Sequence, residues 1–152
     1  MSVKYILYNP LSCNGKGTEL AKKLTEIYKD DELKYCNMTQ ISGYGTFFDS
    51  ISSESDIVLC GGDGTLNRFI NDSDGYPYEN PLYYYGTGSG NDFLRDLGME
   101  QGCEPVRING YVRNLPIVTV NGKSSRFINA IGYGIDGYCC ETGDELREKS
   151  DK

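Results

Sequence analysis

The sequence predicts an α/β fold, in which a mostly parallel β-sheet is flanked by helices. In the first 98 residues, short β-rich runs alternate with helical patterns, an order typical of βα units joined by crossover connections. The run at residues 56–60 (DIVLC) is continuously apolar, as expected for a strand covered on both faces. Two of the runs lead directly into glycine-rich segments. These segments mark strand ends where the backbone can approach a ligand closely.

Each predicted strand is followed by a predicted helix. The first strand ends before Pro10, which has no N–H group to donate to a sheet. Thr18 is an N-cap candidate for the next helix, in which Leu20, Leu24 and Ile27 recur at helical spacing. The same alternation continues along the chain. The predicted strands cover residues 3–8, 33–38, 56–60 and 81–86, and the predicted helices cover residues 19–28, 44–51, 65–70 and 91–98.

The pattern changes after Gly98. Two β-rich runs, residues 115–120 and 123–131, are separated by Asn121-Gly122, which is a strong signal for a hairpin turn. We therefore expect an α/β domain at residues 1–98. Residues 99–152 are expected to form a β-rich extension and the start of a second, antiparallel domain, of which this chain holds only the beginning.

The composition excludes several kinds of chemistry. The 152 residues are 38% hydrophobic, enough to form a core without disulfides or a structural metal. They include no His, which excludes Ser-His-Asp triads, histidine bases and histidine-ligated zinc. Lys and Arg number 15 against 22 Asp and Glu, so the net charge is −7. Because no basic stripe offsets this charge, a nucleic-acid partner is not expected.

The N-terminal segment and the pattern of cysteines predict a cytoplasmic protein. The apolar run at the N-terminus ends at Asn9-Pro10, too early for a signal peptide or a membrane span. Six Cys are present, but they form no C-x-x-C pair and have no spacing suited to zinc. We expect them to be reduced and mostly buried thiols.

Residues 56–69 (DIVLCGGDGTLNRF) carry the strongest chemical signal. A buried strand leads into Gly61-Gly62-Asp63-Gly64, and a helix is expected to begin near Thr65. Glycines let backbone N–H groups approach an anion, and a helix N-terminus adds free N–H groups and the positive end of its dipole. An acidic Asp63 beside a phosphate indicates an intervening divalent cation, or a residue that orients a hydroxyl group. The alternative is a tight turn whose Asp caps the helix.

Two known phosphate-binding patterns do not match. A Walker A loop requires G-x-x-x-x-G-K-[ST], and Gly122-Lys123-Ser124 lacks a Gly five residues before Gly122, where Ile117 stands. The dinucleotide pattern G-x-G-x-x-G also fails, because Gly62-x-Gly64 leads to Asn67 and Gly86-x-Gly88 leads to Asn91.

Three segments together resemble the diacylglycerol kinase catalytic domain family, which includes YegS-like bacterial lipid kinases and sphingosine kinases. They are NPLSCNGKG at 9–17, GGDGTLN at 61–67 and GTGSGNDFLRDLG at 86–98. The resemblance implies an NAD kinase/phosphofructokinase-like fold that binds ATP and Mg²⁺ and transfers the γ-phosphate to a lipid hydroxyl such as that of diacylglycerol. It also implies that a second domain, largely outside this chain, holds the lipid, the general base and any transient membrane contact.

The resemblance assigns roles to individual residues. Asp63 becomes the catalytic acidic group and a metal ligand, and Asp92 and Asp136 lie on the acceptor side. Cys13 replaces a Gly of the family pattern, which could shift phosphate contacts to Gly15, Lys16 and Gly17. The residues assigned to the nucleotide are Asn9, Pro10, Ser12, Cys13, Gly15, Lys16, Thr39, Gly61, Gly62, Asp63, Gly64, Thr65, Asn67, Thr87, Gly88 and Asn91.

Other interpretations stay open for several of these residues. Lys16 could be a solvated loop charge, Ser12 and Thr39 could satisfy turn backbone groups, and Asp92 could cap the helix that follows it. The whole domain could instead be an NAD kinase relative or a non-catalytic nucleotide-binding module. Under the lipid-kinase interpretation, the isolated chain is expected to bind ATP weakly and to turn over little or nothing.

Overall fold

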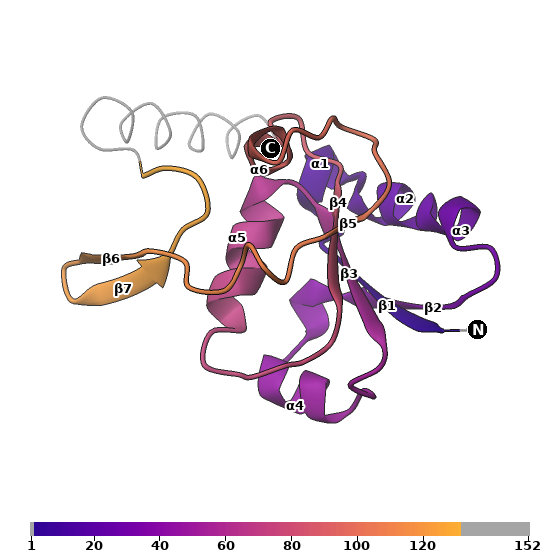
Figure 1. The fold of residues 1–152 in the computed structure, drawn as a ribbon, viewed down its shortest axis with the longest axis horizontal. Helices are drawn as coiled ribbons and strands as arrows, with labels where there is room; N and C mark the ends of the chain where they lie inside the picture. The colour runs from indigo at the N-terminus through magenta and orange to yellow at the C-terminus, as the bar shows by residue number, and fades with distance from the viewer. Residues whose placement is uncertain (1, 132–152) are drawn as a thin grey trace.

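A computed structural model describes residues 2–131, which form a five-stranded sheet with helices on both faces (Figure 1). The strand order is β2-β1-β3-β4-β5, with β5 antiparallel to β4 and every other pair parallel. The predicted mostly parallel α/β fold is therefore confirmed. The strands are β1 (Val3–Tyr8), β2 (Glu32–Asn37), β3 (Asp56–Gly61), β4 (Leu82–Gly86) and β5 (Val106–Arg107).

Short helices connect the strands. They are α1 (Ser12–Gly15), α2 (Gly17–Lys22), α3 (Leu24–Ile27), a 3₁₀ helix (Met38–Gln40), α4 (Tyr44–Asp49), α5 (Asp63–Asp72) and α6 (Asp92–Asp96). The single helix predicted at 19–28 was wrong. The Lys23 N–H group bonds to the Leu20 carbonyl, three residues back, and this tightened turn divides the segment into α2 and α3.

The predicted N-cap at Thr18 was also wrong, because α2 already begins at Gly17 and has no side-chain cap. Gly17 is buried, and a Cβ atom added there would overlap the carbonyl oxygen of Asn9. The missing side chain therefore lets the helix start directly against the loop that follows β1.

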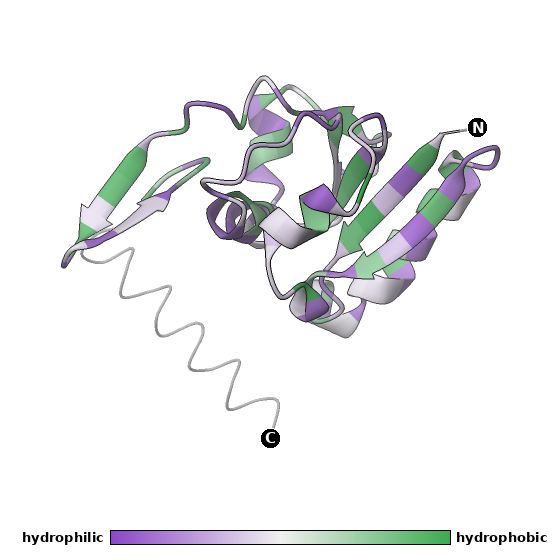
Figure 2. Cartoon of the chain, turned by 90° about the horizontal axis from the view of Figure 1, so that it is seen from below, coloured by the Kyte–Doolittle hydropathy of each residue, from purple (hydrophilic) through white to green (hydrophobic). Residues whose placement is uncertain are grey.

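The sheet is covered by a separate hydrophobic cluster on each face. On one face, Ala21 and Leu24 from α2 and α3 pack against Ile6, Val58 and Cys60. The other face carries the larger cluster, which includes buried residues of α4, α5 and α6. Hydrophobic residues recur along the strands, whereas the connecting loops are mainly hydrophilic (Figure 2). The central strand β3 is buried along nearly its whole length, as its continuous apolar run predicted.

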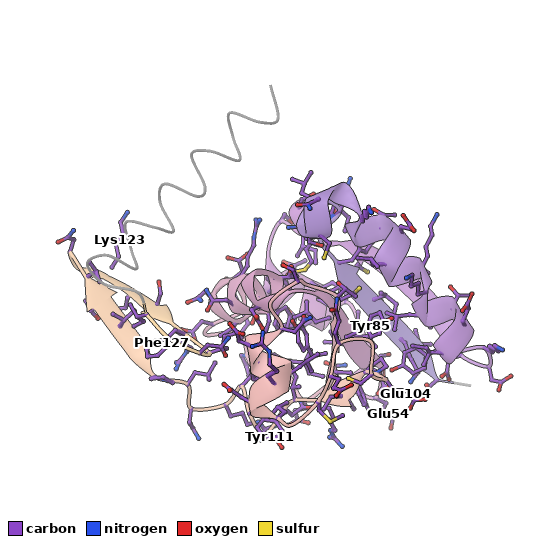
Figure 3. The ribbon with its side chains drawn as sticks, turned by 90° about the horizontal axis from the view of Figure 1, so that it is seen from above. Glu54, Tyr85, Glu104, Tyr111, Lys123 and Phe127 are labelled. Atoms are coloured by element: carbon purple, nitrogen blue, oxygen red, sulfur yellow. The ribbon has the colours of Figure 1, made fainter. Side chains whose placement is uncertain are left out.

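A separate hairpin projects from the body of the molecule. It consists of β6 (Ile117–Val120) and β7 (Lys123–Arg126), and Asn121 and Gly122 both have positive φ at its turn, so the predicted hairpin is confirmed. Figure 3 shows Lys123 near its tip and Phe127 near its base.

The base of the hairpin is fixed to helix α5. Asn71 Oδ1 accepts from the Arg126 N–H group at 2.8 Å, and Asn71 Nδ2 donates to the Arg126 carbonyl at 3.0 Å. One amide side chain on α5 thus bonds both backbone polar groups of the last residue of β7.

Residues beyond 98 contribute to the main sheet as well as to the hairpin, because β5 pairs with β4. The division of the chain into two domains stays a prediction. Within residues 2–131, no helix combines the length and the apolar character needed to cross a bilayer. The four cysteines in this range, Cys13, Cys36, Cys60 and Cys103, are free thiols. Of these four, Cys60 is buried and the other three are partly exposed, so the expectation of mostly buried thiols was wrong for this range.

Candidate functional site

A cleft of about 440 Å³ lies where the chain connections reverse direction. From β1 the chain crosses to β2 on one side and then returns to place β3 on the other side of β1. In open parallel sheets, ligands bind at this point, outside the carboxyl ends of the strands. The lining residues come mostly from the segments after β1, β3 and β4. They are Asn9, Ser12, Cys13, Asn14, Met38, Gly62, Asp63, Gly64, Thr65, Arg68, Gly88, Ser89 and Gly90.

The loop after β1 folds around Asn9. Its Oδ1 accepts from the Leu11 N–H group at 3.0 Å, and its carbonyl accepts from the N–H group of Ser12 at 3.1 Å and from the hydroxyl at 2.7 Å. Ser12 therefore satisfies a turn carbonyl, as its simpler interpretation predicted. Its side chain also lines the cleft.

Cys13 connects this loop to the loop after β4. Its backbone is left-handed, with φ 54° and ψ 45°, a conformation that disfavours residues other than Gly. The thiol donates to the Thr87 carbonyl at a sulfur–oxygen distance of 3.2 Å. The structure thus explains why a Gly suits this position and shows what the Cys side chain contacts instead.

The first turn of α5 faces the cleft with unused backbone donors. Its N-cap is Gly62, which has no side chain to accept a hydrogen bond. The Gly62 carbonyl accepts from the N–H groups of Thr65 and Leu66, at 3.0 and 3.1 Å. The N–H groups of Asp63 and Gly64 belong to the part of a helix that has no intrahelical acceptor. Gly62, Asp63 and Gly64 all line the cleft, so the free N–H groups of this turn face a space of the kind in which helix N-termini can hold anions.

Asp63 caps a helix other than its own. Its two carboxylate oxygens accept from the backbone N–H groups of Asp92 at 2.8 Å and of Phe93 at 3.2 Å, in the first turn of α6. The expected alternative, in which Asp63 caps α5, was therefore wrong, and Asp92 lies inside α6 rather than at its N-cap. The Asp92 side chain pairs with Arg95 at 3.0 Å.

The glycines after β4 allow a close backbone approach. A Cβ atom added to Gly88 would lie 2.6 Å from the Gly62 Cα atom, so this contact requires glycine. Asn91 has φ 51° and donates from its side-chain amide to the Gly88 carbonyl. Its Oδ1 is buried without a hydrogen-bond partner among residues 2–131. Asn91 thus fixes the loop after β4 through Gly88 without lining the cleft itself.

Burial keeps the strand residues beneath the cleft neutral. It raises the pKa of the Cys60 thiol to about 12. Burial, followed by the nearby charge of Asp63, also raises the pKa of Tyr84. The Tyr84 hydroxyl donates to the Gly61 carbonyl at 3.2 Å. These groups support the glycine turn and offer no proton acceptor near neutral pH.

Mg²⁺ requires near-octahedral oxygen ligands and is usually held by one or two carboxylates together with waters and substrate phosphates. Among residues 2–131, Asp63 is the one carboxylate that lines the cleft, and this part of the chain contains no cluster of three metal-ligating side chains. This arrangement fits a cation bound mainly by phosphate oxygens, with Asp63 as its protein ligand.

The predicted nucleotide residues divide into two groups. Eight of them line the cleft: Asn9, Ser12, Cys13, Gly62, Asp63, Gly64, Thr65 and Gly88. The others are not among its lining residues: Pro10, Gly15, Lys16, Thr39, Gly61, Asn67, Thr87 and Asn91. Thr39 is exposed and bonds to Asn37 through both its N–H group and its hydroxyl. Asp136 lies outside the described residues.

Five lining residues were not among the residues assigned individually to the nucleotide: Asn14, Met38, Arg68, Ser89 and Gly90. Asn14, Ser89 and Gly90 stand inside the quoted motifs, so the motif boundaries contained the signal. Met38 immediately follows β2 and is 5% exposed. Its position at the carboxyl end of a strand could have indicated it. Arg68 stands inside the segment at residues 56–69 that carries the strongest chemical signal, but no role of its own followed from that segment.

The chain is similar in sequence to known proteins of one family. Residues 4–120 match the family described as the diacylglycerol kinase catalytic domain. A diacylglycerol kinase of Bacillus subtilis (strain 168) is 32% identical over 141 residues, which cover 85% of this chain and 45% of the relative. Diacylglycerol kinases of two Staphylococcus epidermidis strains are 30% identical, covering 93% of this chain and 47% of each relative.

The chain thus spans about half the length of these curated relatives. The matched region includes β1 apart from Val3, β2 to β6, and the loops after β1, β3 and β4 that line the cleft. The chain belongs to the diacylglycerol kinase catalytic domain family.

Proposed function

We propose that this chain is the N-terminal, nucleotide-binding part of an ATP-dependent lipid kinase, which transfers the γ-phosphate of ATP to a lipid hydroxyl such as that of diacylglycerol. The family match and the names of the relatives support the reaction class. The observation that carries the proposal is the uncapped first turn of α5, which opens into the cleft between two glycine-rich loops.

Phosphoryl transfer depends mainly on positioning and on charge stabilisation. In this proposal the N–H groups of Asp63 and Gly64 donate to the polyphosphate, and the close contact of Gly62 with Gly88 keeps the two loops at a fixed separation. Asp63 orients the first turn of α6 through its two hydrogen bonds. Mg²⁺, when bound beside Asp63, would supply additional charge neutralisation.

A charge placed at Gly64 tests nucleotide binding without disturbing the fold. A Cβ atom at Gly64 meets no atom within 4 Å, and an acidic residue in the first helical turn favours the helix dipole. Gly64→Asp should therefore remain folded but weaken Mg-ATP binding about tenfold or more, because it places a like charge beside the phosphates. Gly64→Asn is the uncharged control of the same size.

Isothermal titration calorimetry measures both variants against the wild-type chain. We expect the wild-type chain to bind Mg-ATP at millimolar or lower concentration, and Gly64→Asp to bind it about tenfold or more weakly than Gly64→Asn does, because the two variants differ only in the added charge. Absence of binding by the wild-type chain, or equal binding by the two variants, would contradict the proposal.

A second assay identifies the acceptor. The intact gene product is incubated with γ-labelled ATP and vesicles that contain diacylglycerol, and in parallel with NAD⁺. We expect label in the lipid fraction on thin-layer chromatography. Label in the NAD⁺ arm alone would assign the protein to NAD kinase chemistry, and label in neither arm, with ATP binding intact, would favour a non-catalytic nucleotide-binding module.

A further inference from the structure

The cleft contains one cationic side chain among the described residues, and it is Arg68 on α5. Lys16, the predicted phosphate contact, is exposed and lies outside the cleft lining. The chain as a whole has a net charge of −7, and the cleft also contains the carboxylate of Asp63. A polyphosphate that enters this cleft therefore meets a negative background, and Arg68 is the side chain placed to offset it.

The position of Arg68 on its helix suits this role. Gly64, Arg68 and Asp72 are spaced four residues apart and form one exposed row on α5. The Cα–Cβ bonds of helical residues point toward the helix N-terminus, so the turn that contains Gly64 is within reach of another rotamer of Arg68. Gly64 has no side chain, and the space beside it is open. An anion held by the first-turn N–H groups would thus lie within the range of the Arg68 guanidinium.

In the structure Arg68 is paired with Asp72, which lies one helical turn closer to the C-terminus of α5 and therefore away from Gly64. The distance between Arg68 Nε and Asp72 Oδ2 is 3.2 Å, and the side chains are 56% and 48% exposed. A solvent-exposed pair of this type contributes little to stability. A phosphate, which carries more charge and accepts two parallel N–H bonds from one guanidinium, is a stronger partner.

We propose that Arg68 is a specificity-determining residue that contacts the polyphosphate of the bound nucleotide, and that Asp72 competes with the nucleotide for it. This inference rests on the proposed function, since it assumes a nucleotide in the cleft. On this inference, Arg68 makes the cleft bind nucleotides with more phosphate groups more tightly than those with fewer. Removal of the guanidinium should cost ATP more affinity than adenosine, and removal of the competing carboxylate should increase the affinity for ATP.

Four variants of the chain test the inference. Arg68→Gln removes the charge, Arg68→Lys retains a charge without the planar guanidinium, and Asp72→Asn removes the competitor. Arg107→Gln is the control with the same loss of charge. Arg107 is exposed, and it stands opposite Tyr83 in the β4–β5 strand pair, away from the carboxyl end of β4 where the cleft lies. Calorimetry with Mg-ATP, ADP, AMP and adenosine gives the affinities, and circular dichroism checks that each variant is folded.

We expect Arg68→Gln to weaken ATP binding about tenfold, the factor typical of a hydrogen bond to a charged group, and to change adenosine binding less than twofold. Arg68→Lys should recover part of the ATP affinity that Arg68→Gln loses. Asp72→Asn should tighten ATP binding about two-fold by removal of a surface ion pair. Arg107→Gln should bind ATP like the wild type. The ATP affinity of the wild type should also fall with added salt more steeply than that of Arg68→Gln.

The inference and the proposed function fail in distinguishable ways. If the wild-type chain binds no ATP, the proposed function is contradicted and the inference falls with it. If the wild type binds ATP and Gly64→Asp abolishes binding, but Arg68→Gln binds ATP like the wild type, the inference alone is overturned. An equal loss of ATP and adenosine affinity in Arg68→Gln would also overturn it, because it would indicate a change in cleft shape.

Discussion

The carboxylate of Asp63 accepts a hydrogen bond from the backbone N–H group of Asp92 at 2.8 Å, across 29 residues of sequence. It therefore links the first turn of α5, which faces the cleft, to the first turn of α6. Its second oxygen accepts from the Phe93 N–H group at 3.2 Å. An acidic residue that the sequence suggested for metal binding thus also has a structural role, which explains how its carboxylate is held in place beside the free N–H groups of the first turn of α5.

Loss of this cap should loosen α6. Asp63→Ala removes the acceptor of two N–H groups, and we expect a loss of about 1–2 kcal/mol in the free energy of unfolding, the range for helix N-caps. Hydrogen exchange of the amides of Asp92 and Phe93 should accelerate more than that of amides in β3. Unchanged protection of these two amides would show that the cap is not formed in solution.

The close approach of Gly88 to Gly62 should not tolerate a methyl group. A Cβ atom on Gly88 would lie 2.6 Å from the Gly62 Cα atom, so Gly88→Ala must separate the two loops. We expect a destabilisation of about 1–3 kcal/mol, as for overpacked sites, together with weaker nucleotide binding. Thermal denaturation and calorimetry measure the two effects.

Gly90→Ala is the matched control in the same loop. A Cβ atom there would lie 3.5 Å from Asp63 Oδ2, which is an ordinary van der Waals contact. This variant should retain the stability of the wild type, and because Gly90 itself lines the cleft, the comparison of the two variants rests on the unfolding free energy. Equal effects of the two substitutions would indicate that the glycine contact does not set the loop separation.

Cys13 should be replaceable by the Gly of the family pattern. Its φ of 54° costs a side-chain-bearing residue about 1–2 kcal/mol, while the lost thiol contact with the Thr87 carbonyl is a weak hydrogen bond. Cys13→Gly should therefore leave the unfolding free energy unchanged or higher and should preserve ATP binding. A clear loss of stability, measured by urea denaturation, would mean that the thiol contact outweighs the backbone strain.

A buried ion pair at the opposite end of the sheet should make stability depend on pH. Lys4 is 8% exposed and bonds to Asp56, with Asp31 at 3.6 Å. Burial alone would lower the pKa of Lys4, but the hydrogen bond and charge of Asp56, together with Asp31, raise it above its ordinary value. Lys4→Met leaves Asp56 unpaired and should cost about 3 kcal/mol near neutral pH.

The pH dependence of the unfolding free energy follows from the directions in which the pKa values of Lys4 and Asp31 are shifted. Because the pKa of Lys4 is raised, its contribution is complete below the ordinary lysine value of roughly 10.4 and is lost as the pH rises through the folded-state pKa. Hydrogen bonds from Ser2, and then the charge of Lys4, lower the pKa of Asp31, so its contribution is lost on acidification below roughly pH 4. Urea denaturation from pH 3 to 11 should show the wild-type advantage over Lys4→Met narrowing at both extremes. A constant difference across this range would contradict the assignment.

Much of the fold followed from the sequence because its signals are local. The apolar run of β3 and the Asn121-Gly122 turn each depend on neighbouring residues, and both predictions were confirmed. The start of α2 at Gly17 was missed because it depends on contact with Asn9, which no local pattern reveals.

The site was predictable to the extent that its motifs are continuous. Gly62, Asp63 and Gly64 were predicted to lie in one turn, and they line the cleft together. The link from Asp63 to α6 and the place of Arg68 in the cleft depend on how α5 and α6 are oriented in three dimensions. Such relationships between distant segments follow from packing and are not contained in any single motif.

The central claim is that the first-turn N–H groups of α5 bind polyphosphate, and NMR of the ¹⁵N-labelled chain tests it most directly. On titration with Mg²⁺ and a non-hydrolysable ATP analogue, the largest amide shift changes should occur at Asp63 and Gly64, and Gly64→Asp should abolish them. Shift changes centred instead on the second cleft, which Tyr76, Asn109 and Arg113 help to line, would contradict the claim.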